Sequence, residues 1–123
     1  MPVRSLSSSV LRWPDARTVD QVVRRWAEQI AQQHPEVRRI GYFGSYARGD
    51  WGVGSDLDTI VIVEHSQEPF IRRAACWDTL DLPVPVDLLI YTLSEWQRCS
   101  LRLREKIVWV YPPTNSFSHR CLR

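Results

Sequence analysis

The chain has 123 residues, enough for one domain with a modest core and too few for two domains of ordinary size. Hydrophobic residues make up 44% and charged residues 24%, which excludes a disordered or fibrous protein. The formal net charge is +2, so the chain lacks the strongly basic balance of a dedicated nucleic-acid binder, and we expect no strong nucleic-acid binding.

Cysteine spacing and apolar runs point away from secretion and from a membrane. Cys76, Cys99 and Cys121 are odd in number and widely spaced, which argues against a disulfide framework or a zinc site. The longest apolar run, near residues 59–63, is far shorter than the roughly 20 residues that a membrane span needs. We therefore expect a cytoplasmic protein with no membrane partner.

The first part of the chain predicts a lead-in, a helix and a strand. Residues 1–17 are rich in Ser, Arg and Pro without periodicity and predict an extended or flexible N-terminal segment. From Thr18 apolar residues recur at helical spacing until Pro35, which ends the predicted helix. Residues 37–43 are rich in β-formers and predict a strand.

The second part predicts further strands alternating with helices. Residues 56–64 form the clearest strand, with an apolar run typical of burial on both faces. Helices are expected at residues 69–80 and from 94 to about 105, and strands at 84–91 and 107–111. This alternation predicts an α/β (α+β) fold in which helices pack on one central sheet of about four strands.

The glycines are concentrated in one 14-residue stretch, which contains all five of them: Gly41, Gly44, Gly49, Gly52 and Gly54. Glycine is kept where the backbone must bend sharply or approach another group closely. The stretch is therefore the first candidate for chemistry. Gly41 lies inside a predicted strand, where close packing or a bulge is the usual reason for glycine.

The sequence Gly44-Ser45 follows a predicted strand and precedes a predicted helical turn at residues 46–48. The first N–H groups of such a turn and its dipole favour an anion. Ser45 adds a hydroxyl, and Arg48 lies one turn further on, where its guanidinium could pair with phosphate. Taken alone, the pattern also fits an ordinary loop. Tyr46 and Trp51 in the same stretch are candidates for stacking near a base.

Three carboxylates follow this stretch. Asp56 and Asp58 are two residues apart at the start of a strand, so both leave the same face, with Cα atoms about 6.6 Å apart. Two solvated acids at a strand end are the simple alternative. Asp87 lies among apolar residues of a later strand, where an unpaired carboxylate is costly. A phosphate-binding turn beside three acids is the set of groups that two-metal phosphoryl transfer requires, with Mg²⁺ ions about 3.5–4 Å apart.

The combined motif resembles the signature of the polymerase-β nucleotidyltransferase superfamily. It consists of Gly-Ser at residues 44–45, Asp-Leu-Asp at 56–58 after ten intervening residues, and Asp87 on a later strand. The form of the glycine stretch is similar to that of the small members, the minimal nucleotidyltransferases (MNT). The resemblance implies a nucleotidyltransferase domain over residues 18–111, with a polymerase-β-like mixed sheet, and leaves residues 112–123 as a flexible tail.

The resemblance also implies a role for each motif residue. Gly44 and Ser45 hold the β- and γ-phosphates of ATP or another nucleoside triphosphate, with Arg48 as a helper. Asp87, besides binding metal, helps to deprotonate the acceptor hydroxyl, which attacks the α-phosphate and expels pyrophosphate. The implied ligands of two Mg²⁺ ions are Asp56, Asp58 and Asp87. Thr59 departs from the family pattern, which has an aliphatic residue there.

In the minimal family the usual partner is a separate all-helical HEPN protein, a toxin for which the MNT protein is the antitoxin. The resemblance therefore implies transfer of AMP to a tyrosine hydroxyl of such a partner. The alternative is a non-catalytic, nucleotide-binding module that neutralises a helical partner by complex formation, with Trp96 and Trp109 as candidate anchors. Association into a homo-oligomer is compatible with the sequence.

Overall fold

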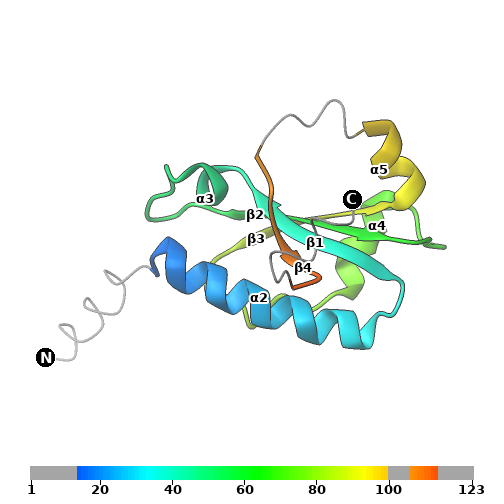
Figure 1. Cartoon of the computed structure of the whole chain (residues 1–123), viewed down its shortest axis with the longest axis horizontal. Coiled ribbons are helices and arrows are strands. Elements are labelled where there is room, and N and C mark those ends of the chain that lie inside the picture. Colours follow the sequence, from blue (N-terminus) through cyan, green and yellow to red (C-terminus); the bar gives the residue numbers. More distant parts are fainter. Residues whose placement is uncertain (1–13, 100–105, 114–123) are drawn as a thin grey trace, which may run out of the picture.

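The long helix α2 (Ala16–Gln33) packs along one face of the sheet (Figure 1). The computed structural model describes residues 14–99 and 106–113. The helix begins two residues before the predicted Thr18, because the side chain of Asp15 caps it by accepting a hydrogen bond from the Thr18 N–H. It ends before Pro35, as predicted. Its buried residues follow one stripe: Val19, Val23, Trp26, Ala27 and Ile30.

Four strands form one mixed sheet, which confirms the predicted fold class. The strands are β1 (Val37–Phe43), β2 (Leu57–Val63), β3 (Val86–Thr92) and β4 (Val108–Tyr111). They lie in the order β3-β2-β1-β4. Strand β1 runs antiparallel to β2 and β4, whereas β2 and β3 are parallel.

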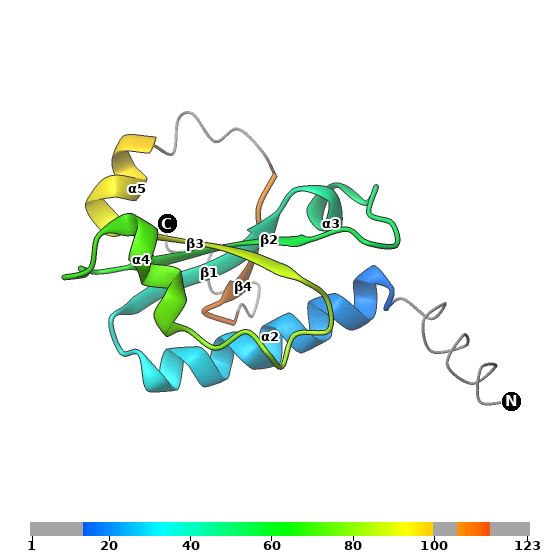
Figure 2. The same cartoon turned by 180° about the vertical axis from the view of Figure 1, so that it is seen from behind.

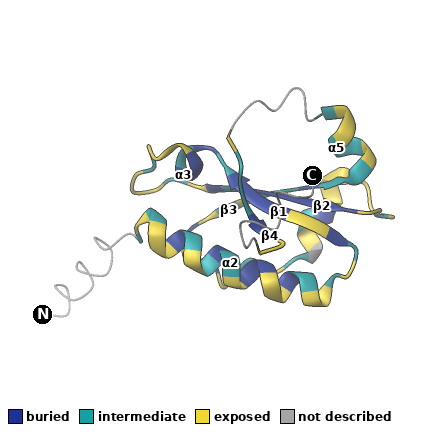
Figure 3. Cartoon of the chain, in the orientation of Figure 1, coloured by how far each residue is buried: buried dark blue, intermediate teal, exposed yellow. Residues whose placement is uncertain are grey.

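The two faces of the sheet have different coverings. Figures 1 and 2 show α2 against one face, and the short helices α3 (Ser45–Arg48) and α5 (Leu93–Cys99) on the side of the other. Every residue of β2 after Asp58 is buried, which confirms the expected burial on both faces (Figure 3). The α2 face carries most of the core. The paired acidic residues of the candidate site lie on the opposite face.

The connection between β2 and β3 is less helical than predicted. Residues 69–80 contain only α4 (Phe70–Arg73) and one 3-10 turn, η1 (Ala74–Cys76). The prediction fails because Asp78 turns the chain: its carboxylate accepts from the Leu80 N–H, and its carbonyl accepts from the Trp26 indole at 2.8 Å. These bonds replace a further helical turn.

The limits of the last elements also differ from the expected ones. Strand β3 begins at Val86, after Pro85 rather than across it, because proline has no N–H for the ladder. Helix α5 is described to Cys99. The expected remainder of that helix, most of the predicted N-terminal segment and most of the predicted tail lie outside the described residues.

Gly41 is explained by the packing of β4. A Cβ atom at Gly41 would lie 2.8 Å from the Trp109 ring and 2.9 Å from the Val108 carbonyl oxygen. The pairing of β1 with β4 also shifts its register between Ile40 and Gly41. Both expected reasons for this glycine are therefore present. Trp109 is engaged further by Arg39, whose guanidinium lies 3.7 Å from the ring centroid, and by Trp96 at 6.0 Å edge to face.

A largely buried ion pair ties α4, β3 and α5 together. Arg73 is 7% exposed, and its guanidinium lies 2.6 Å from Glu95. The same guanidinium donates to the Ile90 carbonyl at 2.9 Å, while Glu95 accepts from the Thr92 N–H at 2.8 Å. Hydrogen bonding from Arg73 lowers the pKa of Glu95 to about 2. The pair therefore fixes the start of α5 above the end of β3.

This ion pair predicts a loss of stability in acid. Because the folded pKa of Glu95 lies below its ordinary value of 4.5, its contribution is complete above that value and disappears as the pH falls towards 2. The free energy of unfolding of Glu95→Gln, measured by urea denaturation, should therefore change less between about pH 5 and pH 3 than that of the wild type. The exposed Glu28→Gln should behave as the wild type. Parallel pH profiles for all three proteins would contradict this account.

Thr59 generates a second stability prediction. It is 0% exposed, and its hydroxyl has no hydrogen-bond partner among the described residues. Removing an unsatisfied buried hydroxyl while keeping the side-chain shape should raise the free energy of unfolding, so we expect Thr59→Val to stabilise by about 1–2 kcal/mol. Thr92→Val should destabilise, because the Thr92 hydroxyl accepts from the Glu95 N–H at 3.2 Å. Equal signs for the two variants, in chemical denaturation, would show that this reading of Thr59 is wrong.

Candidate active site

The turn from β1 into α3 is built on Gly44. This residue has a φ of +76° and a ψ of −148°, a combination that glycine adopts without strain and other residues rarely adopt. Its carbonyl accepts from the Ala47 and Arg48 N–H groups at 3.0 and 2.9 Å, and Ser45 opens the helical turn. The expected helical turn after the Gly-Ser pair is therefore confirmed, one residue longer than predicted at its start.

Asp58 lies directly against this turn. In the antiparallel pairing of β1 with β2, Phe43 is opposite Asp58, so the next residue, Gly44, reaches the carboxylate. A Cβ atom at Gly44 would collide with Asp58 Oδ2. Glycine is thus required here for two reasons, the backbone angle and the space that the carboxylate fills.

Asp87 is the neighbour of Asp58 on the next strand. The two residues are partners in the parallel pairing of β2 with β3, which places their Cα atoms about 4.8 Å apart on the same face. Asp58 is half-buried, whereas Asp87 is exposed. The expectation that apolar neighbours would surround Asp87 is wrong, because Val86 and Leu88 alternate to the other face of the edge strand.

Asp56 lies just before β2, at the same end of the sheet. It is exposed, and the following residue, Leu57, donates its N–H to the Pro85 carbonyl at 2.8 Å. All three predicted acids therefore belong to one end of the parallel pair. Within residues 14–99 and 106–113, however, no group of three acidic, His or Cys side chains is gathered closely enough to hold a metal ion by itself.

The donor set nevertheless fits Mg²⁺. Its members are carboxylates, and two of them, Asp58 and Asp87, are cross-strand neighbours. Mg²⁺ is usually bound through one or two carboxylates, with phosphate oxygens and water completing its shell, rather than by an all-protein cage. Asp58 and Asp87 would hold such an ion together with a bound phosphate.

Two contacts in the glycine-rich stretch were not expected from the sequence. Arg48 forms an ion pair with Asp50, with Nε and Oδ2 3.2 Å apart, at the C-terminal end of α3. The rings of Tyr46 and Trp51 stack on each other, with centroids 5.6 Å apart. Since Tyr46 is buried in this stack, its ring packs within the protein instead of serving as a platform for a base.

Ser55 is a residue that the sequence reasoning missed. Its hydroxyl accepts from the Gly52 N–H at 2.8 Å, and its own N–H donates to the Gly52 carbonyl at 3.0 Å. These bonds close the loop between α3 and β2 into a defined turn. A serine three residues after a glycine, directly before the first acid, was the available signal.

Gly44→Ala tests the packing of the turn. The positive φ with this ψ is alone unfavourable for alanine by about 1–3 kcal/mol, and the displaced Asp58 adds to this, so we expect a loss of at least about 2 kcal/mol in the free energy of unfolding. Gly52→Ala is the matched control, because no atom lies within 4 Å of a Cβ placed there. Chemical denaturation of the two variants checks the prediction, and similar stabilities would refute it.

No described helix is both long and apolar enough to cross a membrane.

The chain has similarities to known proteins, although among curated proteins none matches it. One of the solved structures that match is that of a proposed nucleotidyltransferase from Sulfolobus solfataricus, with 21% identity and a TM-score of 0.56 over 68% of this chain and 75% of that chain. This likeness supports the fold alone. The model of the family described as "Nucleotidyltransferase domain" matches residues 23–111, which include the whole acid-bearing site. With a match of that extent, the chain belongs to the nucleotidyltransferase domain family.

Proposed function

We propose that this nucleotidyltransferase transfers AMP from ATP to a tyrosine hydroxyl of a helical HEPN-type partner, and so acts as an antitoxin in the cytoplasm. The observation that carries the proposal is the placement of Asp58 between Gly44 and Asp87. One carboxylate thus lies against the candidate phosphate turn and beside a second, exposed carboxylate. The choice of AMP and of a HEPN-type acceptor rests on the resemblance to minimal nucleotidyltransferases.

Each residue of the candidate site has a separate role in the proposed reaction. Ser45 and the start of α3 would hold the β- and γ-phosphates, and Asp58 and Asp87 would hold Mg²⁺. The bound metal would offset the negative charge of the phosphate oxygens. The acceptor oxygen forms a bond to the α-phosphorus, the bond from that phosphorus to the bridging oxygen breaks, and pyrophosphate leaves. The hydroxyl proton passes to Asp87, whose exposure leaves it within reach of an incoming hydroxyl.

The test uses ATP labelled at the α-phosphate, Mg²⁺ and a helical HEPN-type protein as the proposed acceptor. We expect the label to appear on the helical protein, and the rate to fall by at least about 100-fold in Asp58→Asn and Asp87→Asn, because each loses a metal ligand. Removal of Mg²⁺ by a chelator should abolish labelling. Asp81→Asn, which changes an exposed acid in the loop before β3, should retain the wild-type rate.

The alternative function has a different outcome. A non-catalytic module would neutralise the helical protein without labelling it, and Asp58→Asn would neutralise it equally well. Labelling that persists at the wild-type rate in both Asn variants would contradict the proposed roles of the acids. An unlabelled partner that still forms a complex would instead favour neutralisation by binding.

A further inference from the structure

The direction of the reaction restricts where an acceptor can bind. This inference rests on the proposed function. In phosphoryl transfer the attacking and leaving oxygens lie roughly in line on opposite sides of the phosphorus. If pyrophosphate leaves towards Ser45 and α3, the acceptor hydroxyl must arrive from the side of the acids that faces away from α3. On that side, the same face of the sheet leads along β3 towards α5 (Figure 1).

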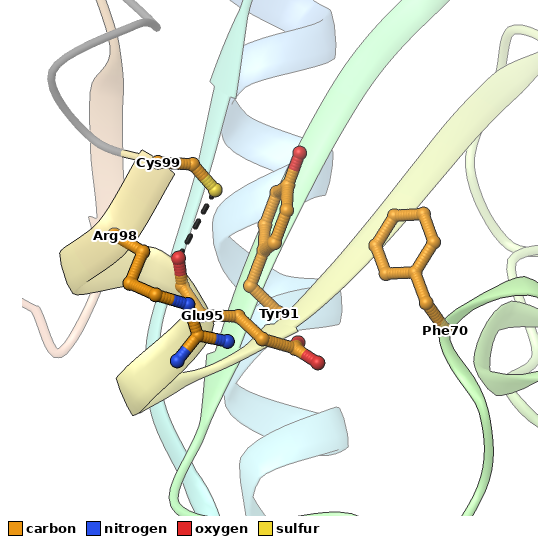
Figure 4. Close-up of a pocket in the computed structure, with 5 residues that line it drawn as sticks. All are labelled: Phe70, Tyr91, Glu95, Arg98 and Cys99. Atoms are coloured by element: carbon orange, nitrogen blue, oxygen red, sulfur yellow. Dashed lines mark hydrogen bonds between the residues drawn. The ribbon is translucent and has the colours of Figure 1, made fainter.

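A groove lies in that direction, where α4, β3 and α5 meet. Figure 4 shows its lining: Phe70, Tyr91, Glu95, Arg98 and Cys99. Its volume is about 410 Å³, and it is open to one side. Tyr91 follows Asp87 by four residues on the same strand, so it shares its face and lies about 13 Å along it. The groove is therefore on the acid-bearing face, at a distance that a short peptide segment can span.

The groove wall is mainly apolar. The rings of Phe70 and Tyr91 lie 5.2 Å apart, centroid to centroid, and tilt by 38°. Phe70 is 42% exposed, and the adjacent Ile71 is 85% exposed, so apolar surface continues out of the groove onto α4. The two rings and the adjoining aliphatic Ile71 together form an apolar surface of the kind that buries a protein side chain at an interface.

The charges around the groove are unequal. Glu95 lines the groove, but its carboxylate forms an ion pair with the Arg73 guanidinium at 2.6 Å. Arg98 also lines it and is exposed, and among the described residues no carboxylate forms an ion pair with it. The charge that the groove presents to a ligand is therefore positive.

We propose that this groove docks the acceptor protein through an acidic, amphipathic helix. One apolar side chain of that helix occupies the space beside Phe70 and Tyr91, and a neighbouring carboxylate pairs with Arg98. A tyrosine about two helical turns away on the same helix then reaches the Asp87 end of the face. The groove selects the acceptor, and the three aspartates act on whichever hydroxyl it delivers.

The experiment compares two synthetic peptides as acceptors. Each has a single tyrosine followed by leucines about four and seven residues later, the spacing of one helical face. One peptide carries glutamates beside the leucines, and its twin carries lysines at the same positions. With Mg²⁺ and ATP labelled at the α-phosphate, we expect the acidic peptide to be labelled at least about 10-fold faster.

Variants of the groove give the decisive comparison. Arg98→Glu should reverse the preference between the peptides, and Phe70→Ser should slow labelling of both. Arg25→Glu, the same charge change at an exposed position on α2, should leave the preference unchanged. Binding of Mg²⁺–ATP, measured by calorimetry, should be equal in all of these proteins.

Three results would overturn the docking proposal: equal labelling of the two peptides, a preference that Arg98→Glu does not alter, or no labelling of either peptide by a protein that labels the helical partner. Labelling of an added single-stranded oligoribonucleotide in place of the peptides would also overturn it. Failure of the wild type to label the helical partner would instead refute the proposed function, so the two proposals fail in distinguishable ways.

Discussion

The contact between the Gly44 backbone and the Asp58 carboxylate is the constraint on which the site depends. It exists because β1 and β2 pair with Phe43 opposite Asp58, so the first residue after β1 lies beside the carboxylate. The parallel register of β3 then places Asp87 next to Asp58. The candidate phosphate turn, the half-buried Asp58 and the exposed Asp87 are thus aligned across three strands by the hydrogen-bond ladder. A slip of one residue in either pairing would move an acid to the opposite face.

The rest of the fold keeps that ladder in place and leaves one face available. Helix α2 covers the opposite face with its apolar stripe, and the Tyr42 hydroxyl joins the two layers by donating to Asp20 at 2.7 Å. Trp109 packs over Gly41 on β1, and the Arg73–Glu95 pair anchors the start of α5. The candidate active site and the proposed docking groove therefore lie at two ends of the same face, held by different contacts.

The sequence predicted the parts of this arrangement that are local or strictly periodic. The single sheet, the long helix and the Gly-Ser turn follow from periodicity and from spacing along the chain, whereas the mixed strand directions were implied by the family resemblance. The exposure of Asp87 does not, because it depends on β3 being an edge strand, and the short α4 follows from bonds made by Asp78 to a distant helix. The groove joins Phe70, Tyr91 and Arg98 from three elements, so no continuous motif could reveal it.

The most direct test of the central claim is a crystal structure with Mn²⁺ and a non-hydrolysable ATP analogue, with the metal located by anomalous scattering. We expect the anomalous peak between the carboxylates of Asp58 and Asp87, with the β- and γ-phosphates at Ser45 and the start of α3. A peak elsewhere in the protein, or a triphosphate bound away from the Gly44 turn, would contradict this account of the site.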